Sequence, residues 1–293
     1  MTCSRKHTLV TGCSSGIGRA TALRLATNGQ HVYAGVRNTG DGDRLARSAA
    51  GGEITPLMLD VTKASHIADA AGVIAGHTVP GGLDGLVNNA GYGLACPTEL
   101  VELDAFRRQL EVNLTGPLAV TQAVLPSLRR ARGRIVMVST IGVRFSPPFA
   151  GPLDATKAGL TALGETLRQE LAPWGIKVVL VAPASINSGA AGKVARDAAA
   201  AMAAAEPQRR ALYADTFAKM LDVMQRREAN GSPPDVVAAT ISTALTKPRP
   251  RAVYLTGKDA RRLAMISTLP APILDQARRR IFRLPAPGSL AHS

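Results

Sequence analysis

Three glycines follow the first apolar run of the chain, at a spacing suited to binding phosphate groups. The stretch TLVTGCSSGIGRA places Gly12, Gly16 and Gly18 directly before a segment with helical character. Glycine permits a tight turn and a close approach of the backbone to a pyrophosphate, and the free N–H groups at a helix N-terminus bind anions. Because this turn lies between an expected strand and an expected helix, it predicts a dinucleotide-binding site.

The end of the second apolar run indicates which dinucleotide binds. HVYAGVRN has Val36 and Arg37 where a carboxylate would otherwise accept hydrogen bonds from both ribose hydroxyls. A guanidinium cannot accept those bonds, but it can pair with a 2′-phosphate. We therefore expect NADP(H) in preference to NAD(H). Asp60, at the end of the third run, either accepts a hydrogen bond from the adenine amino group or is an ordinary turn residue.

Short apolar runs alternate with helix-like segments over the first 190 residues, and this rhythm predicts the fold. Runs such as HVYAGV, GRIVMVST and KVVLVAP are separated by segments with helical spacing, among them residues 16–28, 117–131 and 153–172. Strands that recur after helices need crossover connections, which predicts an α/β fold with a doubly wound parallel sheet, Rossmann-like. We expect a single domain over residues 1–260. It would carry an Ala-rich helical insertion at 188–232 as a lid over the substrate, and a basic C-terminal extension would follow at 261–293.

The net charge of +14 raises nucleic acid as a partner, but its distribution argues against one. Ten basic and two acidic residues lie between Leu245 and Ser293, so more than half of the net charge is in the C-terminal part. Aromatic residues make up only 3% of the chain, which is poor material for stacking bases. We expect a solvated basic tail, and the alternative is contact with an anionic membrane surface.

The cysteine pattern and the N-terminus indicate a reducing, cytoplasmic setting. Cys3, Cys13 and Cys96 are odd in number and too widely spaced for a disulfide framework or a zinc site, so no metal is expected. MTCSRKH runs directly into the first expected strand and leaves no room for the apolar core of a signal peptide.

Five motifs in a fixed order give the chain a resemblance to the short-chain dehydrogenase/reductase family. They are TGCSSGIG, NNAG at 88–91, EVNLTG around residue 113, VST at 138–140 and KAG from residue 157. The resemblance runs from about Thr8 to Ser188. It implies hydride transfer between a nicotinamide and a substrate carbon, with a serine orienting the carbonyl and a tyrosine moving the proton. A lysine four residues later would bind the nicotinamide ribose, and an asparagine would hold a relay water.

Carried onto this sequence, the resemblance assigns Asn113, Thr140 and Lys157 to the catalytic positions, with Ser139 beside Thr140. The tyrosine position is Leu153, which has no group able to carry a proton. The glycine turn and the resemblance together assign the cofactor to Gly12, Ser14, Ser15, Gly16, Ile17, Gly18, Arg37, Asp60, Val61, Asn89, Ala90, Gly91, Lys157, Pro183, Ile186 and Ser188.

Two other residues could replace the missing tyrosine. Asp154 is adjacent to Leu153 but about 100° around the helix. We therefore expect it to be an early-turn acid that favours the helix N-terminus and pairs with Lys157, and to replace the tyrosine only if the helix register or start shifted. Tyr92 follows the fourth expected strand, and we expect it to be an aromatic wall of the pocket. Water relayed by Asn113 or Thr140 is a further route.

Two functions remain open from the sequence. One is an NADP(H)-dependent oxidoreductase for the carbonyl/alcohol pair of a bulky apolar substrate, because the 188–232 insertion is rich in Ala, Leu and Met. The other is a scaffold that binds NADP(H) without turnover, which Leu153 favours. The resemblance also implies a homodimer or homotetramer packed through helices at 99–131 and 153–172.

Overall fold

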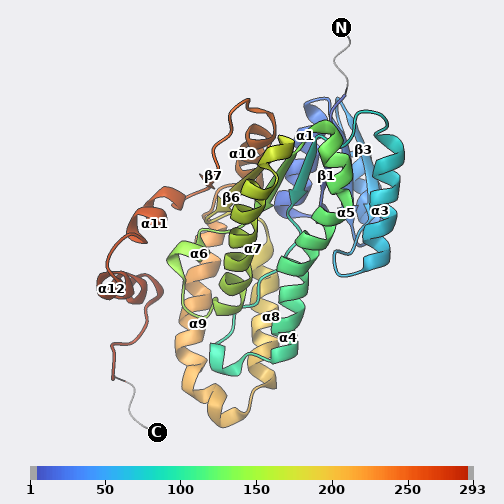
Figure 1. Cartoon of the computed structure of the whole chain (residues 1–293). Helices are drawn as coiled ribbons and strands as arrows, with labels where there is room; N and C mark the ends of the chain where they lie inside the picture. Colours follow the sequence, from blue (N-terminus) through green and yellow to red (C-terminus); the bar gives the residue numbers. More distant parts are fainter. Residues whose placement is uncertain (1–4, 290–293) are drawn as a thin grey trace.

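A seven-stranded parallel sheet forms the centre of the protein, as the alternating pattern predicts. The computed structural model describes residues 5–289, so Cys3 and the last four residues of the extension lie outside the described part. The strand order is β3-β2-β1-β4-β5-β6-β7, the order of a doubly wound, Rossmann-like domain (Figure 1). The strands are β1 (His7–Val10), β2 (His31–Val36), β3 (Glu53–Met58), β4 (Gly85–Asn88), β5 (Arg134–Val138), β6 (Lys177–Pro183) and β7 (Val253–Thr256).

Helices cover both faces of this sheet, and for that reason the central strands are apolar on both sides. One face carries α1 (Gly16–Thr27), α2 (Thr39–Arg47) and α10 (Pro234–Thr246), which bury Leu25, Leu45 and Ile241. The other face carries α3 (Ala64–His77), α5 (Gly116–Ala131) and α7 (Gly151–Glu170). The fold prediction is confirmed.

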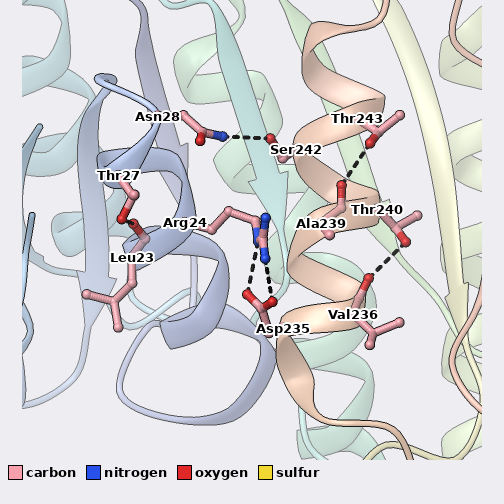
Figure 2. Close-up of polar contacts among 10 residues, drawn as sticks. All are labelled: Leu23, Arg24, Thr27, Asn28, Asp235, Val236, Ala239, Thr240, Ser242 and Thr243. Atoms are coloured by element: carbon pink, nitrogen blue, oxygen red, sulfur yellow. Dashed lines mark hydrogen bonds and ion pairs between the residues drawn. The ribbon is translucent and has the colours of Figure 1, made fainter. Parts of the chain in front are cut away.

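The first and last helices of one face lie side by side. Arg24 of α1 donates to both carboxylate oxygens of Asp235 at the start of α10, and Asn28 Nδ2 donates to Ser242 Oγ at 3.1 Å (Figure 2). The ion pair is exposed and contributes less than about 1 kcal/mol. The buried apolar contacts of Val237 and Ile241 therefore hold α10 in place more than the ion pair does.

A third group of helices lies beyond the carboxyl ends of the strands, on the side away from the N-terminus (Figure 1). It includes α4 (Leu103–Leu110), α6 (Gly142–Phe145), α8 (Ala190–Ala204) and α9 (Pro207–Ala229). The π-helical turn Glu111–Thr115 joins α4 to α5, and the 3-10 turns Thr98–Leu100 and Ala172–Trp174 complete the short elements. The 188–232 segment thus forms two helices next to the sheet end where ligands bind in such folds.

The C-terminal extension is folded, which differs from the expected solvated tail. It contains α11 (Ala260–Ile266) and α12 (Ala271–Phe282), and Leu263, Leu274 and Phe282 are buried in a cluster with residues of α6, α8 and α9. Sequence reasoning followed the arginines and overlooked the apolar residues between them. Within residues 5–289, no helix combines the length and hydropathy needed to cross a bilayer.

Candidate active site

A cavity of about 610 Å³ opens at the carboxyl ends of the strands. Its wall comes from the turns after the first six strands, from the start of α1, and from α6, α7, α8, α9, α11 and α12. Every residue that the sequence assigned to the cofactor borders this one cavity: Gly12, Ser14, Ser15, Gly16, Ile17, Gly18, Arg37, Asp60, Val61, Asn89, Ala90, Gly91, Lys157, Pro183, Ile186 and Ser188. Their roles in binding stay predictions.

The glycine turn has the close backbone packing that a dinucleotide site requires. Gly12 has φ +71°, and a Cβ there would stand 2.9 Å from Ala90 Cα. A Cβ at Gly18 would collide with the carbonyl oxygen of Gly12. Asn89 fixes the turn from the neighbouring strand, because its Nδ2 donates to Thr11 O at 2.9 Å. This cradle leads into the N-terminus of α1, so the residues present fit a pyrophosphate.

The adenosine end of the cavity has one cationic side chain and one carboxylate already engaged in a turn. Arg37 is exposed at the cavity edge. Asp60 Oδ1 accepts from Thr62 N at 3.0 Å and from Thr62 Oγ1 at 2.7 Å. Burial alone would raise the pKa of Asp60, but the two Thr62 hydrogen bonds and the charges of Arg37 and Lys63 together lower it. Asp60 is therefore a turn residue that also borders the cavity.

Lys157 is a buried ammonium group at the junction between the glycine turn and the deeper cavity. Its Nζ donates to Val138 O at 2.7 Å, and the side chain is 8% exposed. Burial lowers the pKa of Lys157 to about 8, so at neutral pH most of the molecules carry the charge and a minority do not. Gly91 lies between this Nζ and Asn113, since a Cβ at Gly91 would stand 3.4 Å from Nζ and 3.0 Å from Asn113 Oδ1.

Asn113 lies behind the cavity wall and does not line it. It is fully buried, and its Oδ1 accepts from Tyr92 N at 3.0 Å while its Nδ2 donates to Tyr92 O at 2.9 Å and to Thr156 Oγ1 at 3.0 Å. These bonds tie the loop after β4 to α7. In this structure Asn113 holds Tyr92 at the cavity wall, and both polar atoms of its side chain already have hydrogen-bond partners.

Thr140 and Leu153 both face the cavity, at the two positions where the resemblance expects polar hydroxyls. Thr140 Oγ1 accepts from Gly142 N at 3.1 Å, which leaves its O–H free to donate toward a ligand. Leu153 packs against the loop after β4, since its Cδ2 is 3.3 Å from the position of a Cβ at Gly93. Ser139 is bonded to Thr161 Oγ1 at 2.7 Å and is turned toward α7.

Asp154 borders the cavity. We expected it to act at the site only after a shift of the helix, and its role stays a prediction. The helix register is regular from Gly151, but the loop after β5 folds over the first turn of α7, so the cavity reaches the Asp154 face as well. Burial raises the pKa of Asp154 to about 7, against the charge of Arg278, which lowers it. The expected pairing with Lys157 does not occur among the ion pairs of residues 5–289, because Lys157 bonds to Val138 instead.

Tyr92 forms an aromatic wall of the cavity, the role that the sequence favoured. Its hydroxyl points away to Ala105 O at 3.4 Å, and Lys193 Nζ lies 5.9 Å from the ring centroid. Burial raises the pKa of Tyr92 above its usual value. A hydroxyl directed to α4 and held in its neutral form is poorly placed to move a substrate proton.

The deeper part of the cavity is apolar, and part of its wall was missed by sequence reasoning. Its side chains are Phe145, Leu153, Val194, Met224, Leu263 and Phe282. Leu263 and Phe282 come from the C-terminal extension. The spacing of Leu274, Ile281 and Phe282 along the basic helix could have indicated from the sequence that one face of this helix is buried. In the described part of the chain, no group of three or more His, Cys, Asp or Glu side chains is arranged to hold a metal ion.

The fold, the glycine cradle and the buried lysine define the class of the protein. Residues 6–199 match the family model "short chain dehydrogenase", and the chain belongs to the short-chain dehydrogenase/reductase family of oxidoreductases, whose fold binds nicotinamide cofactors. Over 290 residues it is 33% identical to retinol dehydrogenase 5 of Homo sapiens, covering 97% of this chain and 91% of that protein.

Solved structures show the same architecture. A short-chain dehydrogenase from Streptomyces avermitilis superposes with a TM-score of 0.73 at 28% identity, covering 97% of both chains. A metagenomic short-chain oxidoreductase in complex with NADP gives a TM-score of 0.64 at 26% identity, covering 85% of this chain and 95% of that one.

Proposed function

We propose that the protein is an NADP(H)-dependent oxidoreductase that acts on the carbonyl/alcohol pair of a bulky apolar substrate, with proton transfer altered by Leu153. The observation that carries this proposal is one continuous cavity with two chemically different halves. One half has the glycine cradle and Arg37, and the other has apolar side chains from α6, α8, α9, α11 and α12. Lys157 and Thr140 lie between these halves, where a reacting carbonyl would meet the nicotinamide.

The preference for NADP(H) rests on charge at the adenosine end. Val36 and Arg37 follow β2, and neither can accept hydrogen bonds from a ribose diol. A guanidinium there favours a 2′-phosphate, which it can bind with two parallel hydrogen bonds. A solved neighbour of the chain holds NADP.

The apolar substrate class rests on the wall of the inner cavity. Phe145, Met224 and Phe282 give this part of the wall a large apolar surface, against which a sugar or other polyol would lose hydrogen bonds. Retinol dehydrogenase 5, to which this chain is similar over almost its full length, is named for a long apolar alcohol.

The residues of the chain divide the work of such a reaction. When bound, the nicotinamide supplies or accepts a hydride at the substrate carbon. The Lys157 ammonium would hold the nicotinamide ribose, and the Thr140 hydroxyl would donate to the substrate oxygen. The helices α8, α9 and α12 exclude water from the site, which strengthens both contacts.

The second candidate is an NADP(H)-binding scaffold without turnover, and Leu153 is the observation that favours it. Removing a positioned general acid typically costs about 10²–10⁴ in rate, so the loss of the hydroxyl alone could silence the site. Both candidates share every cofactor contact. Only the proton path distinguishes them.

The test combines cofactor binding with single-turnover chemistry in the same samples. NADPH binding would be followed by fluorescence, and NADPH oxidation would be measured against a panel of apolar aldehydes and ketones. Leu153→Tyr should keep NADPH binding and raise the rate by about 10²-fold, the lower end of a general acid's contribution. Leu153→Phe is the matched control, because it adds the ring without the hydroxyl.

The two candidates predict different results for the chain as it stands. Measurable oxidation with Leu153 in place supports the oxidoreductase. Tight NADPH binding with turnover only in Leu153→Tyr would make the protein a scaffold. Absence of NADPH binding would contradict both.

Three further expectations belong to this proposal. We infer a homodimer or homotetramer formed through α4, α5 and α7, supported by the exposed Leu103 and Trp174 near those helices.

We infer a cytoplasmic protein. Contact with an anionic membrane is supported by exposed Met265 and Ile273 beside the arginines of α11 and α12, and binding to phosphatidylserine vesicles tests it.

A further inference from the structure

Asp154 is a carboxyl group of the cavity wall that the described function does not use. Asp154 Oδ2 is buried and has no hydrogen-bond partner within residues 5–289. Its partner oxygen, Oδ1, packs against Gly142, because a Cβ at Gly142 would collide with it. A buried polar atom without a partner costs free energy, and such atoms are uncommon in native structures. Asp154 itself borders the cavity, so this carboxyl group lies at the wall of the site with one oxygen buried and unpaired.

The carboxyl group lies near Thr140, the residue whose hydroxyl would orient the substrate. The same Cβ position at Gly142 lies 3.3 Å from Thr140 Cγ2, so Asp154 Oδ1 and Thr140 border one glycine from two sides. Leu153, one residue earlier on α7, faces the loop after β4 on the other side of the cavity mouth. Asp154 therefore lies on the Thr140 side of the site, where a reacting oxygen would sit.

We propose that the Asp154 carboxyl group donates and accepts the substrate proton in this protein, in place of a tyrosine hydroxyl. The inference rests on the proposed carbonyl/alcohol reaction and deepens it. In reduction, the carbonyl carbon gains a hydride from the reduced nicotinamide while the π electrons of the C=O bond move to oxygen. The O–H bond of Asp154 breaks, its proton joins that oxygen, and the carboxylate regains a proton from solvent. Oxidation of the alcohol runs in reverse.

The charged groups around Asp154 suit both protonation states. Burial keeps a fraction of the carboxyl groups neutral near pH 7, which a donor requires. Arg278 of α12 stabilises the carboxylate left after transfer, and it is held in place by Phe145 O at 2.7 Å and Asp275 Oδ1 at 2.8 Å. Lys157, on the same helix, points to Val138 and leaves the carboxyl group unpaired.

The deciding variant is Asp154→Asn, which keeps the shape of the side chain and removes its proton. We expect NADPH binding within about threefold of the parent chain and single-turnover oxidation slower by about 10²–10⁴-fold. Asp104→Asn is the matched control, since Asp104 is also a first-turn acid but is exposed on α4, and it should change neither quantity. Asp154→Glu keeps an ionisable group and should retain part of the rate with a displaced pH profile.

A spectroscopic readout tests the same residue without turnover. The protein is labelled with [4-¹³C]aspartate, and the infrared spectra of the parent chain and Asp154→Asn are compared. A protonated-carboxyl band that is present in the parent chain and missing from the variant is assigned to Asp154. We expect this band to be present at pH 6, to disappear as the pH rises past 7, and to shift when NADP⁺ and decanol are added. A band absent at pH 6, or unchanged by the alcohol, would overturn the assignment.

The outcomes separate this inference from the function on which it rests. Equal rates in Asp154→Asn and the parent chain would sink the role of Asp154 and leave the oxidoreductase standing. No turnover in the parent chain, with activity gained in Leu153→Tyr, would contradict both. A slow Asp154→Asn with normal NADPH binding and a lost infrared band would support both.

Discussion

At the residue scale, a single guanidinium carries the expected choice of cofactor. Arg37 is exposed at the cavity edge and has no ion-pair partner among the described residues, so its charge is available to a ligand. Asp60, the nearby carboxylate, is bonded to Thr62 and does not pair with it. The proposed preference for a 2′-phosphate therefore depends on Arg37.

Replacing Arg37 should weaken NADPH binding more than NADH binding. A hydrogen bond to a charged group is worth roughly 1.5–3 kcal/mol, so Arg37→Ala should raise the NADPH Kd by about 10- to 100-fold and leave the NADH Kd nearly unchanged. Fluorescence titration with both cofactors measures this. Arg44→Ala removes an exposed arginine of α2 outside the cavity and is the control; an equal loss for both cofactors would contradict the 2′-phosphate contact.

At the scale of elements, the C-terminal helices are part of the binding site. Phe282 is 5% exposed and lines the cavity, while Leu274 of the same helix is 7% exposed and packs in the cluster without reaching the cavity. Arg278, between them, donates to Phe145 O and thereby attaches α12 to α6. The basic extension thus adds both apolar wall and fixed charge to the site.

The two buried side chains of α12 provide a matched pair of substitutions. Burying a phenylalanine against an apolar ligand is worth roughly 1.5–3 kcal/mol, so Phe282→Ala should raise the KM for apolar aldehydes by about tenfold or more. Leu274→Ala should lower the melting temperature and change KM little, because it removes packing at a position that does not contact the ligand. Substrate kinetics and thermal melts of both variants, with NADPH binding as the folding check, measure the difference. Equal KM values in the two variants would remove α12 from the substrate wall.

At the scale of the whole molecule, a group of ionisable rings lies at the amino-terminal parts of β1 and β2, away from the cavity at the carboxyl ends. His7, His31 and Tyr33 stack on one another, with ring centroids 4.6 to 6.0 Å apart, and His77 of α3 lies beside them. Burial lowers the pKa of both His7 and His31 below 6.5, although Asp84 and Glu53 act in the opposite direction. Charging these rings in the folded state is therefore unfavourable.

This depression of the pKa links stability to pH. In the unfolded chain His7 and His31 become protonated near pH 6.5, whereas in the folded chain they do so only at lower pH. The folded state is therefore most favoured by these histidines above pH 6.5, and it loses this contribution to stability as the pH falls below 6.5. Asp154, whose pKa is raised, contributes in the opposite sense over the same range. We therefore expect the double variant His7→Gln/His31→Gln to lose less stability between pH 7 and pH 5 than the parent chain. Urea melts across this range measure it, and parallel curves for the two proteins would refute the linkage.

The sequence by itself determined the features that depend on local spacing. The glycine turn, the alternation of strands and helices, Arg37 after β2 and Lys157 one turn after Leu153 are all set by residues close together in the chain. Local backbone sterics and the two side-chain periodicities fix such features whatever surrounds them. The family and the parallel sheet followed from these alone.

Only the tertiary structure decided which groups share the cavity. The loop after β5 folds over α7 and brings Asp154 to the site, the amide of Asn113 is occupied by Tyr92 and Thr156, and α12 closes the wall with Phe282. These contacts join residues far apart in the chain and depend on how whole elements pack. The position of a residue around its helix and the number of charges in a segment do not determine such packing. The proposed proton path through Asp154 therefore depends on packing, since the residue that the motif would assign to it is a leucine.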